Sequence, residues 1–173
     1  MARTFPRRGI KLGTAGMFEV ENIVQADQPI GRVWDVLTAF AEFEQWHPYV
    51  WIEGRAAYGG VIRYGLKQLA GLPARRTVPA RVLHFEPKRT LGWRLWVPRL
   101  LTVDEFYTLS GAGARTVVRH HVRCEGPISG LIRRPVSRKV KSLLERADAA
   151  LATKLGDRVT ERYRSSDRRS KRR

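Results

Sequence analysis

The sequence predicts an α+β domain in which one antiparallel sheet wraps around a long C-terminal helix. Three observations lead to this prediction. Short segments of alternating apolar and polar residues fill the middle of the chain, a helical pattern precedes them, and a long apolar stripe at helical spacing follows them. The expected order is a strand, two short helices, a meander of strands and one long helix.

The N-terminal part predicts one strand and two short helices. Residues 17–26 are typical of a strand that ends before Pro29. Pro29 suits a first helical turn, and apolar residues recur at helical spacing over 30–39. The aromatic residues of 40–46 predict a second short helix, which stops before Pro48.

The middle of the chain predicts a meander of six strands. Alternation is clearest where Ile62, Tyr64 and Leu66 share one face and Arg63 and Lys67 share the other, so one face of the sheet is expected to meet water. The predicted strands are 49–57, 61–68, 77–85, 91–96, 101–110 and 115–125.

The last two of these strands form the clearest hairpin. If the four small residues 111–114 form the loop, Glu105 lies directly opposite His120. The same register pairs Leu109 with Thr116, Tyr107 with Val118, Val103 with Val122, and Leu101 with Cys124. These residues are expected to point inward, because the other face of the second strand carries Arg115, Arg119, His121 and Arg123.

A long amphipathic helix is predicted from about Pro135 to Leu155, with Gly156 as its stop. Its apolar stripe consists of Val136, Val140, Leu143, Ala147, Leu151 and Leu155.

The charge is concentrated at the two ends of the chain. The protein has 33 Lys and Arg against 16 Asp and Glu, a formal net charge of +17. More than half of this excess lies in a basic leader, 1–16, and an Arg-rich tail, 158–173, both expected to be flexible. The folded domain is therefore expected to span 17–157.

Composition excludes several classes of protein. The single cysteine, Cys124, excludes an internal disulfide and a multi-cysteine metal site, which fits a reducing, cytoplasmic setting. No stretch is long and apolar enough for a membrane span or a signal peptide. Neither a phosphate-binding glycine loop nor a dinucleotide fingerprint occurs, so no cofactor or metal is expected.

Several segments in this order resemble the START-like (SRPBCC) superfamily, and within it the polyketide cyclase/dehydrase-like branch with the helix-grip fold. The resemblance covers roughly 17–157 and rests on the element order and on the segments 43–50, 60–64, 91–94, 105–109 and 114–120, with Gly126 before the long helix. It implies an apolar cavity between sheet and helix that takes lipids, sterols or polyketides. Relatives often carry His where Glu105 stands and an acid where Val122 stands, so a catalytic role does not transfer directly.

Glu105, His120 and Tyr107 are the candidate catalytic residues. In one interpretation His120 moves a proton while Glu105 holds its tautomer. In a second, the pair orients a carbonyl or hydroxyl of a bound ligand. In a third, the two residues are a satisfied polar pair inside the core.

Other inward residues are candidates for lining the cavity. The predicted ligand-binding set is Tyr64, Trp93, Val103, Tyr107, Val118, His120, Val122, Leu143 and Ala147. Trp34 and Trp46 are expected to be plain core, Thr116 and Cys124 to be small inner residues, and His47 to have a capping or surface role near the cavity mouth.

The sequence therefore predicts binding of a hydrophobic small molecule, with two alternatives. One is a polyketide cyclase or dehydratase that uses His120 and Glu105. The other is a basic interaction protein that docks on an anionic membrane, or nonspecifically on nucleic acid, through its tail and a basic helix face. That face comprises Arg133, Arg134, Arg138, Lys139, Lys141 and Arg146.

Overall fold

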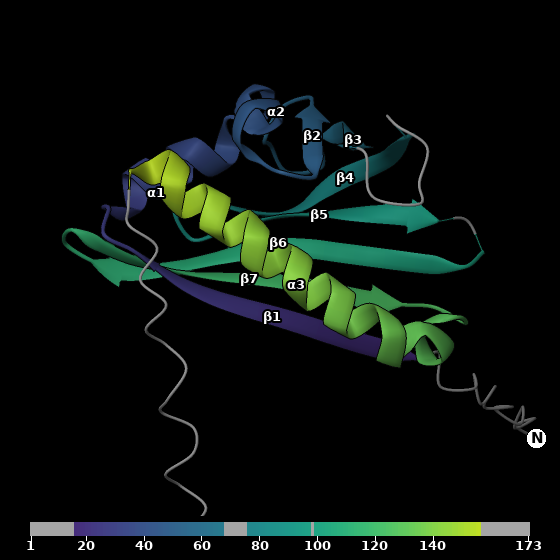
Figure 1. The fold of residues 1–173 in the computed structure, drawn as a ribbon. Helices are drawn as coiled ribbons and strands as arrows, with labels where there is room; N and C mark the ends of the chain where they lie inside the picture. The colour runs from purple at the N-terminus through teal and green to yellow at the C-terminus, as the bar shows by residue number, and fades with distance from the viewer. Residues whose placement is uncertain (1–15, 68–75, 98, 157–173) are drawn as a thin grey trace, which may run out of the picture.

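A seven-stranded antiparallel sheet forms the body of the protein (Figure 1). The computed structural model describes residues 16–67, 76–97 and 99–156, so the predictions for the leader and for the tail, 158–173, lie outside the described residues except at Gly16. The strands are β1 (Met17–Ala26), β2 (Val50–Glu53), β3 (Val61–Leu66), β4 (Arg76–Glu86), β5 (Thr90–Val97), β6 (Leu101–Ala112) and β7 (Arg115–Glu125). Their order across the sheet is β1-β7-β6-β5-β4-β3-β2.

Four helical segments cover one face of this sheet. They are α1 (Ile30–Thr38), the short 3₁₀ helix η1 (Phe40–Glu42), α2 (Phe43–Trp46) and α3 (Ser129–Leu155). Figure 1 shows α3 lying along β1 and β7, with α1 beside the C-terminal end of α3 and α2 beside β2. Helix α1 buries Val33, Trp34, Val36 and Leu37 against the inner face. The predicted α+β, helix-grip architecture is confirmed.

The β6–β7 register differs from the prediction. Tyr107, not Glu105, lies opposite His120, and Glu105 lies opposite Val122. The other observed inward pairs are Leu109–Val118, Val103–Cys124 and Gly111–Thr116, so all five predicted pairings were wrong. The shift is by two residues, and since side chains alternate with a period of two, every inward residue stays inward.

Glycine explains this tighter turn. Ladder pairing continues to Ala112–Arg115, which leaves a two-residue turn at 113–114. Gly113 has a φ of +65°, as such turns require. A Cβ on Gly111 would lie 2.3 Å from the carbonyl oxygen of Arg115, so only glycine permits the strands to approach there. The sequence analysis assigned residues 111–114 to the loop, whereas Gly111 and Ala112 belong to β6.

Two element boundaries also differ. Helix α3 begins at Ser129 instead of near Pro135, because the turn that follows Gly126 already starts the helix: the Ser129 amide donates to the Gly126 carbonyl at 3.1 Å. Strand β2 ends at Glu53 rather than Ala57, since Gly54 turns the chain with a φ of +127°.

The buried stripe of α3 is rotated from the predicted one. Ala147, Leu151 and Leu155 are buried as predicted, whereas Val136, Val140 and Leu143 are only half-buried. The stripe is completed instead by Leu144, Asp148 and Ala152, which are all buried.

Gly92 is a point where the sheet tolerates no side chain. A Cβ there would lie 2.3 Å from Cβ of Phe106 and 2.8 Å from the carbonyl oxygen of Glu105. We expect Gly92→Ala to destabilise the fold by about 1–3 kcal/mol in urea denaturation, because the backbone of β6 would have to move. Gly31→Ala is the control: its Cβ would meet only a Lys88 side-chain carbon at 4.0 Å, so this helical position should tolerate or prefer alanine. Equal stability of the two variants would contradict the prediction.

Candidate functional site

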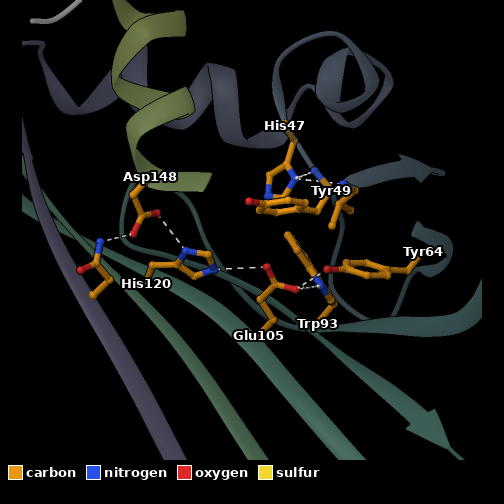
Figure 2. Close-up of polar contacts among 9 residues, drawn as sticks. His47, Tyr49, Tyr64, Trp93, Glu105, His120 and Asp148 are labelled. Atoms are coloured by element: carbon orange, nitrogen blue, oxygen red, sulfur yellow. Dashed lines mark hydrogen bonds and ion pairs between the residues drawn. The ribbon is translucent and has the colours of Figure 1, made fainter. Parts of the chain in front are cut away.

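A buried carboxylate on β6 is the centre of the candidate site (Figure 2). Glu105 Oε1 lies 3.2 Å from His120 Nε2. Its other oxygen, Oε2, accepts hydrogen bonds from the Tyr64 hydroxyl at 2.7 Å and from Trp93 Nε1 at 3.2 Å. Glu105 and His120 therefore meet although they are diagonal neighbours in the ladder, within reach of long side chains.

The array continues from His120 into helix α3. His120 Nδ1 lies 2.9 Å from Asp148 Oδ1. Asn22 on β1 donates to Asp148 Oδ2 at 2.6 Å, and Lys141 donates to Asn22 Oδ1 at 2.8 Å and to the Glu21 carbonyl at 2.6 Å. One hydrogen-bonded chain thus joins β3, β5, β6, β7, α3 and β1.

Electrostatics hold opposite charges within this array. Burial lowers the pKa of His120, but Asp148 and Glu105 outweigh burial and raise it to about 9. Burial raises the pKa of Glu105, but its contacts with His120 outweigh that effect and keep the pKa below its usual value. At neutral pH an imidazolium therefore lies between two acidic side chains.

Tyr107 and Tyr64 enclose the charges as neutral groups. Burial and the nearby Glu105 raise the pKa of both phenols well above the ordinary value. The Tyr107 ring stacks on His120 with ring centroids 4.0 Å apart and planes inclined by 21°. A ring face against an imidazolium is a favourable cation–π arrangement.

His47 approaches the array from the side of α2 (Figure 2). Its Nδ1 accepts backbone N–H bonds from Tyr49 at 3.2 Å and Val50 at 3.0 Å, so the capping role is confirmed. The surface role was wrong, since the residue is 3% exposed. Burial lowers the His47 pKa to about 4, partly opposed by Glu105, so the ring is neutral at pH 7. With Nδ1 accepting, the ring hydrogen must lie on Nε2.

The predicted site residues fall into two groups. Glu105, His120, Tyr64, Trp93 and Tyr107 come together on the inner face. Val118 in β7 and Ala147 in α3 are also buried. Val122 belongs to a separate apolar cluster with Phe18, Val20, Cys124 and Leu144, against which Val103 also packs. Leu143 is half-buried.

The remaining inward residues pack in the core or bond to the backbone. Trp34 is buried and Trp46 packs partly buried against the main core. Thr116 donates to the Gln28 carbonyl at 2.8 Å. Burial, with Asp104, raises the pKa of Cys124 to about 11, which disfavours a thiolate nucleophile.

Sequence reasoning missed Asp148 and Asn22. Asp148 directly follows Ala147, which belongs to the predicted stripe, and lies four residues after Leu144 and four before Ala152, so an acid on a buried helix face was the available signal. Asn22 sits in the first strand with no pattern that marks it.

A surface hollow lies away from this array. It has a volume of about 430 Å³ and is lined by Trp34, Thr38, Ala39, Phe40, Ala41, Gly54, Arg55, Ala56 and Phe85. None of the residues predicted to bind a ligand lines it. The Phe40 side chain lies between the hollow and the Glu105–His120–Asp148 array. It lines the hollow and packs edge-on against Trp93, with the two ring centroids 5.6 Å apart.

The basic helix face is only partly a free surface. Arg138 and Lys139 are exposed, and Arg146 Nη1 lies 3.4 Å from the Tyr49 hydroxyl, whereas Lys141 is committed to β1. The side chains of Arg133 and Arg134 lie outside the described residues.

The model of one protein family, described as polyketide cyclase/dehydrase and lipid transport, matches residues 17–156. The chain belongs to this family. No curated protein matches it. Among solved structures, a START superfamily protein from Mycobacterium smegmatis is similar with a TM-score of 0.65 and 15% identity, over 82% of this chain and 98% of that one. An aromatase/cyclase named Zhui from Streptomyces sp. R1128 is similar with a TM-score of 0.59 and 17% identity, over 81% and 92%. At these identities the two solved structures support the fold alone.

No helix within 16–67, 76–97 and 99–156 is long and apolar enough to cross a membrane. In the same part of the chain, no group of three or more His, Cys, Asp or Glu side chains could hold a metal ion.

Proposed function

We propose that the protein binds a hydrophobic small molecule, lipid-like or polyketide-like, between the inner face of the sheet and α3. The observation that carries this proposal is the charged Glu105–His120–Asp148 array, buried among aromatic side chains. Binding sites for small molecules are mostly apolar with a few converging polar groups. The family's description, which covers both cyclases and lipid transport, supports the same ligand class.

His47 is the group that we assign to the polar end of the ligand. Glu105 already accepts from Tyr64 and Trp93 and contacts His120, so its lone pairs are largely used. The neutral His47 ring carries its hydrogen on Nε2 and lies above Glu105 (Figure 2). It offers a donor to a carbonyl or hydroxyl oxygen of an otherwise apolar molecule.

The array favours binding over catalysis. A general acid must deliver its proton to the substrate within hydrogen-bond reach. Both nitrogens of His120 face carboxylates, and Tyr107 covers the ring. We therefore propose that His120 and Glu105 shape and polarise the interior, and that a cyclase or dehydratase role is the weaker alternative. Substrate turnover that is abolished by Glu105→Gln at unchanged stability would reverse this order.

Native mass spectrometry of protein purified from its own host is expected to find a bound apolar molecule, and fatty acids or aromatic polyketides are expected to raise the unfolding temperature. His47→Asn, whose shorter side chain places an acceptor near the position of Nδ1, should weaken binding of a carbonyl-bearing ligand about 3- to 10-fold through loss of the Nε2 donor. His121→Ala on the opposite face of β7 is the matched control and should leave affinity unchanged. Absence of a bound molecule together with absence of any thermal shift would overturn the proposal.

A further inference from the structure

The buried array of Glu105, His120 and Asp148 carries one net negative charge. His120 has a carboxylate on each side, Asp148 at 2.9 Å and Glu105 at 3.2 Å. Two acceptors at such distances repel each other, so each contact must hold one hydrogen. The fully deprotonated groups would carry three negative charges, and two hydrogens leave one. This net charge is the same whether a hydrogen is assigned to the imidazole or to an acid.

The other oxygens of the two acids accept hydrogen bonds from neutral donors. Glu105 Oε2 accepts from the Tyr64 hydroxyl at 2.7 Å and from Trp93 Nε1 at 3.2 Å. Asp148 Oδ2 accepts from the Asn22 amide at 2.6 Å. Donors without a charge stabilise a carboxylate but do not cancel its charge.

No buried lysine or arginine offsets this charge. In the part of the chain that the structure describes, the buried polar and charged residues include neither type. Lys141 is half-buried and lies behind Asn22, and Lys67 is half-buried and donates to two backbone carbonyls at α2. Arg146 is exposed, 3.4 Å from the Tyr49 hydroxyl. The interior is therefore negative, with positive charges only toward its border.

The polar end of a ligand would meet this negative charge. His47, the donor that we assign to the ligand, lies above the Glu105 carboxylate (Figure 2). An ionised carboxylate on His47 would place two like charges together in a buried interior, which disfavours the ionised form. A carbonyl or hydroxyl oxygen accepts from Nε2 without adding a charge.

We propose that the interior selects ligands whose polar end is a neutral carbonyl or hydroxyl group and excludes an ionised carboxylate. Because it concerns the same ligand, this selectivity rests on the proposed function. A fatty acid or an aromatic acid then binds in its neutral, protonated form. A carboxyl group in water ionises at about pH 4, so this form becomes about tenfold rarer with each pH unit above that.

Equilibrium dialysis of the full chain tests this selectivity with two matched pairs of ligands. They are decanoic acid with methyl decanoate, and 2-naphthoic acid with methyl 2-naphthoate. At pH 8 the ester should bind at least about tenfold more tightly than its acid, and the affinity of the acid relative to the ester should fall at least about tenfold from pH 6 to pH 8. The ester has no ionisable group, so it reports any titration of His47, His120, Glu105, Asp148, Tyr64 or Tyr107 separately.

The outcomes separate this selectivity from the proposed function. An acid that binds as tightly as its ester at pH 8, or whose relative affinity is the same at pH 6 and pH 8, overturns the selectivity alone. Absence of binding in both pairs overturns the proposed function and the selectivity with it.

Glu105→Gln removes the carboxylate below His47 and should reduce the ester-to-acid affinity ratio at pH 8 at least about fivefold. The ratio is measured within one variant, so a general loss of affinity cancels. Glu19→Gln is the matched control, because it removes an exposed carboxylate from the outer face of β1, and its ratio should equal that of the wild type. An unchanged ratio in Glu105→Gln would contradict the proposal. If that variant does not fold, the pH dependence of the wild type decides.

Discussion

Replacing His120 by alanine is expected to destabilise the folded protein by about 3–5 kcal/mol, the range for breaking a buried charged pair from one side. The substitution removes the cation between Glu105 and Asp148, and both acids are buried. It also leaves an opening beneath Tyr107, whose ring stacks on the imidazole. Urea denaturation at neutral pH measures the loss as a change in the free energy of unfolding.

His121→Ala is the control for this measurement. His121 is the next residue on β7, but its ring lies on the outer face beside Glu19 and stacks on Phe106. Surface ion pairs contribute little, so the control should lose no more than about 1 kcal/mol. Similar losses in the two variants would mean that the buried array contributes no more than the surface pair does.

The stability of the wild-type protein is expected to fall on both sides of about pH 6.5. The folded pKa of His120 is about 9, above the unfolded value near 6.5. Its contribution is fully present below pH 6.5 and is lost as the pH rises through 9, on the order of 3 kcal/mol in all. The folded pKa of His47 is about 4. Its neutral state therefore favours the fold above pH 6.5, and a similar amount is lost as the pH falls toward 4.

Glu105 adds to the acid limb, since its lowered pKa contributes stability above the ordinary carboxyl range that is lost as the pH falls through the folded value. Denaturation midpoints across this pH range measure both limbs. His120→Gln should flatten the alkaline limb and His47→Gln the part of the acid limb above pH 4. An alkaline limb that persists unchanged without His120 would refute the assignment.

The spacing of apolar residues predicted the strands and helices, because each of these elements buries one face and exposes the other. The alternation of Ile62, Arg63 and Tyr64 predicted β3, and the boundaries of β1 and β7 agree with their patterns. The β6–β7 register was not predictable in the same way. A shift of two residues leaves the pattern of inward residues intact, so only the turn geometry at Gly111 and Gly113 decides it.

The candidate site was partly predictable for a related reason. Glu105, His120 and Tyr107 share an inward face in either register, which is why their proximity was expected even though the direct pairing was wrong. The position of Asp148 can be predicted only if the rotation of α3 against the sheet is known, and that rotation depends on side-chain packing. The position of His47 can be predicted only from the path of the chain after α2, where its Nδ1 accepts hydrogen bonds from two backbone amides.

The chain of hydrogen bonds from Lys141 to Tyr64 has a consequence for the order in which the protein is made. Its members come from residues 22, 64, 105, 120, 141 and 148, and the last acid belongs to the final helix. A ribosome that has released only the sheet has released His120 and Glu105 without the second carboxylate. The acidic and basic groups of the interior are therefore all present only after α3 has been synthesised as well.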